Sequence, residues 1–118
     1  LSGVPGVAQA GTPAATTARL VLPVERHPCT HIWNQFTLRV PGAGRRDALK
    51  QHLTTAGIGT EIYYPLPLHR QECFAHLPCA SLPVAEQLAA EVLSIPIFPE
   101  LREEELRAVE QDALRWLR

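Results

Sequence analysis

Residues 31–40 read His31-Ile-Trp-Asn-Gln-Phe-Thr-Leu-Arg-Val40, and this stretch is the best candidate for a β-strand in the sequence. Successive side chains of a strand point to opposite faces, so the stretch has one mostly apolar face and one mixed face, as a half-buried strand requires. Pro41-Gly42-Ala43-Gly44 then ends the strand. The apolar face carries Ile32, Asn34, Phe36, Leu38 and Val40, and the mixed face carries Trp33, Gln35, Thr37 and Arg39.

The flanking sequence alternates between strand and helix patterns. Apolar residues recur at helical spacing in three segments. One of these, 83–94, would present Val84, Leu88 and Val92 on one face, and 101–117 would present Leu106, Val109, Ala113 and Leu117. Together the patterns predict an α+β fold in which helices cover a small antiparallel or mixed sheet of about three strands. The expected elements are an edge strand at 20–23, helices at 45–56, 83–94 and 101–117, a strand at 58–64 and a short strand at 95–99.

Residues 1–19 are rich in Gly, Ala, Pro and Thr and follow neither periodicity. Such a segment has little apolar surface to offset the entropy lost on ordering. We therefore expect residues 1–19 to be a flexible leader or an artefactual segment, and the folded domain to occupy residues 20–118.

The composition excludes several classes of protein. The chain has 118 residues, 46% of them hydrophobic, and a net charge of −1, so no overall charge attracts nucleic acid or an anionic membrane. No apolar run is long enough to cross a bilayer. Three cysteines without a Cys-x-x-Cys pair argue against a disulfide framework, so a cytoplasmic location is expected.

One group of residues has the chemistry of metal ligands. His69, Cys73, His76 and Cys79 are spaced so that the first three would share a helix face, and zinc binds such nitrogen and sulfur ligands. The Cys-x5-Cys spacing is unusual for a zinc site, however. The alternative is that Cys73 is a small buried apolar residue and that both histidines lie on the surface or in a pocket.

The segment Gly57-Ile-Gly-Thr-Glu-Ile-Tyr-Tyr-Pro-Leu-Pro-Leu-His69 is the strongest candidate for ligand binding. Tyr63 and Tyr64 offer an apolar ring and a hydroxyl for a polar ligand, and Pro65 and Pro67 stiffen the chain behind them. An apolar turn that caps the sheet would give the same pattern. The residues alone do not separate these two interpretations.

Six blocks in order resemble the C-terminal small domain of the DegT/DnrJ-type nucleotide-sugar aminotransferases, as found in fold-type I aminotransferases. The similarity extends from about Leu20 to Leu117. The blocks are His31–Arg39, Arg46–Leu49, Gly57–His69, Leu82–Glu86, Leu93–Pro99 and Glu103–Leu106.

The resemblance implies a homodimeric enzyme that uses pyridoxal phosphate to transfer an amino group, usually from glutamate, to a keto-sugar nucleotide, in pathways such as polysaccharide biosynthesis. It implies that Tyr63, Tyr64 and His69, with Asn34 as a weaker candidate, face the substrate. It implies no catalytic residue in this part of the enzyme, because the lysine that binds the cofactor belongs to the large domain.

Lys50 is the only lysine of the chain, and it falls within the helix expected at 45–56. We therefore expect the chain alone to bind no pyridoxal phosphate covalently and to be inactive. Two other functions remain open at this point. One is a non-catalytic α+β module that binds a ligand at the tyrosines, and the other is a module stabilised by zinc.

Overall fold

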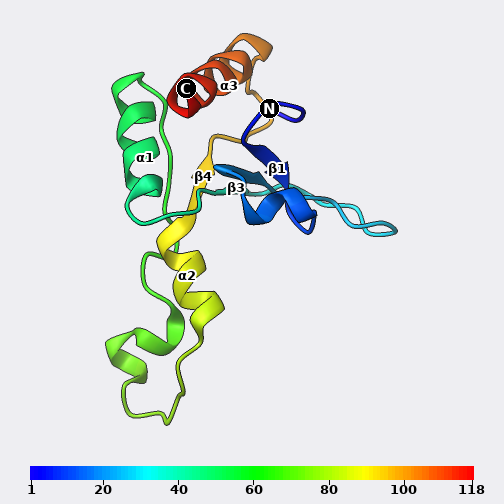
Figure 1. Ribbon diagram of the computed structural model, residues 1–118. Coiled ribbons are helices and arrows are strands. Elements are labelled where there is room, and N and C mark those ends of the chain that lie inside the picture. The colour runs from blue at the N-terminus through cyan, green and yellow to red at the C-terminus, as the bar shows by residue number, and fades with distance from the viewer.

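Strand β3 (Phe36–Arg39) lies inside a mixed four-stranded sheet with the order β1-β2-β3-β4. The computed structural model describes all of residues 1–118. β1 (Val7–Gln9) runs parallel to β2 (Leu20–Leu22), and β3 runs antiparallel to both β2 and β4 (Val92–Ile95). Three α-helices complete the α+β fold that the sequence predicted: α1 (Arg45–Thr55), α2 (Pro83–Glu91) and α3 (Glu103–Leu117) (Figure 1).

The main core lies between the sheet and helices α1 and α3. Leu38 and Leu93 are opposite each other in the β3–β4 register, and neither is exposed to solvent. Alternate residues of β2 and β3 point the same way, so their leucines meet the apolar faces of the two helices. The buried members of this cluster are Leu20, Leu22, Leu38, Val40, Leu49, Leu53, Leu93 and Leu117.

Helices α1 and α3 form close to where their patterns predicted. Gly57 follows α1 with φ +79°, and the Ile58 amide donates to the Leu53 carbonyl at 2.9 Å, so the helix ends in a Schellman turn. In α3 the residues Val109, Ala113 and Leu117 are buried as expected, but Leu106 is half exposed.

Strand β3 is shorter than the predicted 31–40. Trp33 adopts a left-handed backbone with φ +50°, which an extended strand does not allow, so pairing begins only at Phe36. Ile32, expected on the apolar face, is 86% exposed in the loop before the strand.

The strand predicted at 58–64 reduces to one bridge. The Glu61 amide donates to the Ser94 carbonyl at 3.0 Å, and the Ser94 amide donates to the Glu61 carbonyl at 2.8 Å. The ladder stops there because neither flanking position on β4 offers a free amide. The Val92 amide donates to the Leu88 carbonyl at the end of α2, and Pro96 has no N–H.

The helix predicted at 83–94 ends at Glu91, and β4 begins at the next residue. Val92–Ile95 pairs along the whole of β3, and this pairing buries Leu93 and Ser94, which one more helical turn would not do. Val84 and Leu88, expected to be buried, are exposed, and Ala89 and Glu91 face inward instead. The short strand expected at 95–99 is likewise a loop after Ile95.

Residues 1–19, expected to be flexible, contain β1 and a short 3-10 helix, η1 (Pro13–Thr16). β1 completes the edge of the sheet beside β2. Ala8, Ala18 and Val21 form a small second core on the face opposite the main one.

An ion pair joins β3 to the end of α2. Arg39 Nε donates to Glu91 Oε2 at 2.6 Å, and the Gly42 amide and Gln87 side chain donate to Glu91 Oε1. Burial acts to raise the pKa of Glu91, but these donors outweigh it and the pKa is lowered. The carboxylate therefore holds the β3–α1 turn against α2.

None of the helices combines the length and apolar character that a bilayer-spanning segment requires.

Candidate functional site

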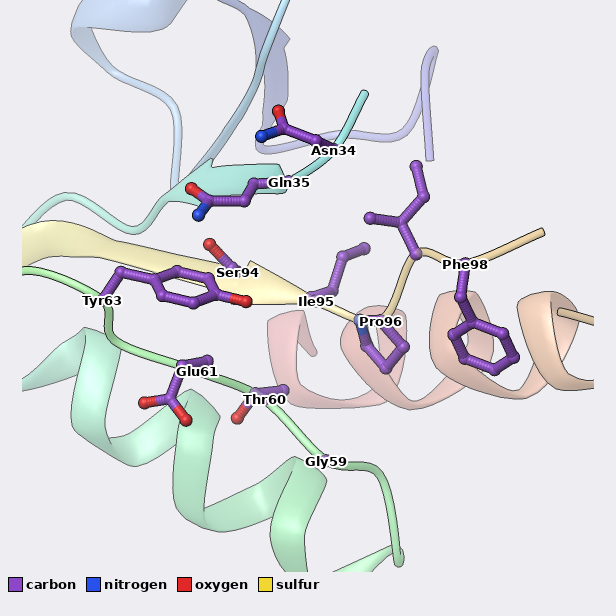
Figure 2. A pocket seen from close by; sticks show the side chains of 11 residues that line it. Asn34, Gln35, Gly59, Thr60, Glu61, Tyr63, Ser94, Ile95, Pro96 and Phe98 are labelled. Atoms are coloured by element: carbon purple, nitrogen blue, oxygen red, sulfur yellow. The ribbon is translucent and has the colours of Figure 1, made fainter. Parts of the chain in front are cut away.

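A cleft of about 520 Å³ opens where β4 leaves the sheet (Figure 2). Its walls come from three parts of the chain: the residues just before β3, the segment after α1, and β4 with the loop that follows it. Figure 2 shows the ring of Tyr63 lying beside β4, with Gln35 on one side and Glu61 on the other. The lining residues are Asn34, Gln35, Gly59, Thr60, Glu61, Tyr63, Ser94, Ile95, Pro96, Ile97 and Phe98.

Two contacts hold the wall formed by residues 59–63. Lys50 Nζ on α1 donates to the Thr60 carbonyl at 2.8 Å, and Glu61 makes its two backbone bonds with Ser94. Ser94 is fixed in turn, because its hydroxyl and that of Thr37 on β3 are 2.8 Å apart. A segment with little regular structure is thus tied to both α1 and β4.

The structure brings together three of the four residues that the sequence suggested as substrate-binding. Asn34 and Tyr63 line the cleft, and Tyr64 lines a small hollow that shares Tyr63 and Glu61 with it. Both tyrosine side chains are largely exposed. His69 is absent from both linings, and its side chain is only 8% exposed.

Four further residues line the cleft that no sequence motif indicated as site residues: Gln35, Glu61, Ser94 and Phe98. One signal was available: Ser94 is the only polar residue in the run Val92-Leu-Ser-Ile-Pro-Ile-Phe98. The contribution of Glu61 depends on a pairing with β4 that no local pattern predicts.

Residues 65–82, called the arm below, connect the cleft wall to α2 and extend beside that helix (Figure 1). The arm contains two single-turn 3-10 helices, η2 (Leu68–Arg70) and η3 (Glu72–Phe74). One carboxylate oxygen, Oε1 of Glu86 on α2, accepts hydrogen bonds from both ends of the arm. Its donors are His69 Nε2 at 2.9 Å, Arg70 at 3.0 Å, the Ser81 hydroxyl at 3.1 Å and the Leu82 amide at 3.1 Å.

These donors stabilise the ionised carboxylate and hold the pKa of Glu86 at about 2, and the His69 imidazole has the largest effect. The pKa in the folded chain is thus below the ordinary carboxyl value, so the stabilisation is complete above that ordinary value. It is lost as the pH falls toward about 2. We expect the difference in melting temperature between the wild-type chain and Glu86→Gln to be constant near neutral pH and to shrink below about pH 4. A gap that stays constant down to pH 2 would contradict this assignment, and Glu103→Gln on α3 is the control.

The zinc module considered from the sequence is not formed. No three His, Cys, Asp or Glu side chains lie close enough together to hold a metal ion. His69 is paired with Glu86, and Cys73 and Cys79 are exposed, with weak contacts to Gln71 and Ala80. The continuous helix that such a site would need is not formed, because η2 and η3 are separate single turns.

The cleft has no positively charged side chain in its lining, and Glu61 is its only ionisable acid. Amides, hydroxyls and a carboxylate bind the hydroxyl groups of a ligand well, and Tyr63 and Phe98 offer apolar surface beside them. A phosphate, by contrast, is normally bound by Arg, Lys or a helix N-terminus. The chemistry of the cleft therefore suits a hydroxyl-rich ring.

The family model of the DegT/DnrJ/EryC1/StrS aminotransferases matches residues 13–113. The chain therefore belongs to this aminotransferase family, as its sequence blocks suggested. Its structural relatives include a family member from Brucella abortus, with a TM-score of 0.76 and 30% identity over 83% of this chain. They also include DesV from Streptomyces venezuelae, with a TM-score of 0.74 and 37% identity over 92% of this chain. The chain covers 26% and 28% of these two structures.

Curated relatives give the same assignment. The chain is 48% identical, over 67% of its length, to a UDP-N-acetyl-3-dehydro-α-D-glucosamine 3-aminotransferase of Acidithiobacillus ferrooxidans. It is 38% identical, over 98% of its length, to a dTDP-3-amino-3,4,6-trideoxy-α-D-glucose transaminase of Streptomyces venezuelae. It spans only 21% and 26% of these two proteins, about a quarter of their length.

The lining of the cleft does not fit pyridoxal phosphate, the cofactor that the sequence resemblance implies. The cleft offers no amine to link to it and no cation to bind its phosphate. Lys50, the only lysine, directs its ammonium group to the Thr60 carbonyl. The cleft therefore does not supply the groups that would hold this cofactor.

Proposed function

We propose that residues 20–118 are the C-terminal small domain of a cytoplasmic, homodimeric, pyridoxal-phosphate-dependent aminotransferase that acts on a keto-sugar nucleotide with glutamate as amino donor. The family match supports this proposal, as does the 38% identity over nearly the whole chain to a transaminase of a nucleotide-linked amino sugar. The cofactor and the lysine that binds it would lie in the larger part of the enzyme, beyond the quarter that this chain represents.

In this proposal the cleft contacts the sugar ring. Asn34 and Gln35 supply amide donors and acceptors, Tyr63 and Ser94 supply hydroxyls, and all four line the same cavity. The absence of cationic side chains from the lining supports contact with the sugar rather than with the diphosphate. Tyr64 would extend this surface at the neighbouring hollow.

The test uses the complete reading frame that contains residues 1–118. With pyridoxal phosphate, glutamate and dTDP- or UDP-linked keto-sugars, we expect formation of 2-oxoglutarate and an amino sugar. Tyr63→Ala and Asn34→Ala should each raise KM for the sugar nucleotide by roughly tenfold, the effect of losing one or two hydrogen bonds. Leu66→Ala is the matched control, because Leu66 is exposed on the arm and lines neither hollow.

Two results would contradict the proposal. Binding of the sugar nucleotide without amino transfer would favour the non-catalytic binding module. Full activity with unchanged KM in both cleft variants would show that the cleft does not contact the substrate.

A further inference from the structure

Outside the cleft, His69 and Glu86 form a partly buried hydrogen bond. The imidazole is 8% exposed, and its Nε2 lies 2.9 Å from Glu86 Oε1. A carboxylate only accepts hydrogen bonds, so Nε2 carries the proton and donates it. That ring nitrogen is therefore occupied within the chain and is not available to a ligand.

The pair lies a short distance along the chain from the cleft. Five residues separate Tyr63 from His69, and two of them, Pro65 and Pro67, have a fixed φ that limits bending. Glu61 holds the other end of this stretch through its bridge to Ser94. The two tyrosines are therefore bracketed by a backbone bridge at Glu61 and a side-chain anchor at His69.

Glu86 is well placed as the fixed point of this anchor. It lies in the first turn of α2, and α2 continues directly into β4, which lines the cleft. The carboxylate also holds Arg70 beside His69, and Ser81 and Leu82 at the far end of the arm. Both ends of the arm are thus fixed to one oxygen atom.

From this geometry we propose that Glu86 and His69 are positioning residues: their hydrogen bond fixes Tyr63 and Tyr64 at the cleft, and His69 acts through this bond rather than by touching substrate. The proposal rests on the proposed function only in treating the tyrosines as the ligand-facing pair. The role of His69 is then defined by its donor nitrogen, so a side chain with a donor at the same reach should replace it.

The chain offers a direct probe, because Tyr63 and Tyr64 are its only tyrosines. Labelling the full 118-residue chain with 3-fluorotyrosine gives two ¹⁹F signals, and both report on this loop. In His69→Phe, which keeps a ring but has no donor, and in Glu86→Ala, we expect both signals to move toward the unfolded position. Their transverse relaxation should slow about twofold as the loop gains motion.

The matched variant is His69→Gln, whose amide nitrogen can still donate to Glu86; its two signals should stay close to those of the wild type. Glu103→Ala, which removes an exposed ion pair with Arg107 on α3, is the control for a general change in charge. Far-UV circular dichroism and slow exchange of the Leu93 amide verify that each variant is folded.

Unchanged signals in folded His69→Phe and Glu86→Ala would overturn the proposal. Signals in His69→Gln as perturbed as those in His69→Phe would also overturn it, since the imidazole itself would then be required. The measurement needs neither substrate nor cofactor, so its outcome is independent of whether the enzyme transfers amino groups.

Discussion

Mixing the 118-residue chain with stoichiometric pyridoxal phosphate is expected to give no borohydride-stable adduct and no amino transfer to any keto-sugar nucleotide. Transamination with this cofactor requires a lysine amine that binds it. The only lysine, Lys50, lies on α1, and its ammonium group donates to the Thr60 carbonyl, which holds the cleft wall. Reaction at Lys50 would break that bond without providing a phosphate site.

The measurement is mass spectrometry after borohydride reduction, together with an assay for 2-oxoglutarate. Lys50→Arg is the matched control, because arginine keeps a donor for the Thr60 carbonyl but forms no such adduct. In the complete enzyme, Lys50→Arg should retain both the reducible cofactor and activity. A reducible adduct on Lys50 that turns over in the isolated chain would refute the expectation.

Leu38→Ala is expected to cost about 2–5 kcal/mol of unfolding free energy, the range for leucine truncations in packed cores. Leu38 lies in β3, has no exposed surface and is opposite Leu93, which is also fully buried. Truncation would leave a cavity between the sheet and helices α1 and α3, and both helices would have to shift to close it. Small domains have total stabilities of about 5–15 kcal/mol, so the loss is a large fraction of the whole.

Denaturant unfolding followed by circular dichroism measures the change, with Leu68→Ala as the matched control. Leu68 is 64% exposed on the arm, so the same truncation there should change stability by less than about 0.5 kcal/mol. Equal midpoints for the two variants would show that the core is not where the structure places it.

Sequence patterns predicted best the elements whose boundaries depend on local chemistry. The end of α1 needed only a glycine at the left-handed position after Ala56, and Gly57 provides it. The buried face of α3 followed from helical spacing over four turns, with Val109, Ala113 and Leu117 in register. Family blocks then identified the fold class without any long-range information.

The elements that were wrong depend on pairing between distant segments. Val92–Ile95 fits a helix or a strand locally, and its partner β3 decides between them. Likewise, β1 forms only because Val7–Gln9 can pair with β2, since its own composition gives it little reason to order. Strand 58–64 stopped at one bridge because the two β4 positions that would extend it offer no amide: Val92 bonds Leu88, and Pro96 has no N–H.

The candidate site was predictable in part. The tyrosines and Asn34 were visible as residue types in a family block, and the structure places them around one region. Glu86 was not suspected, although it ends the block Leu82–Glu86, because its importance comes from four donors drawn from residues 69–82. No sequence spacing indicates such a convergence.

The direct junction between Glu91 and Val92 has a practical consequence for anyone who recombines family members. With no linker between α2 and β4, a chimaera joined at this point would set a foreign helix at an angle dictated by the host strand. The graft would misdirect the arm even if every contact residue were retained. Residues 59–98 should therefore be exchanged as a single cassette, with crossover points placed before Gly59 and after Phe98.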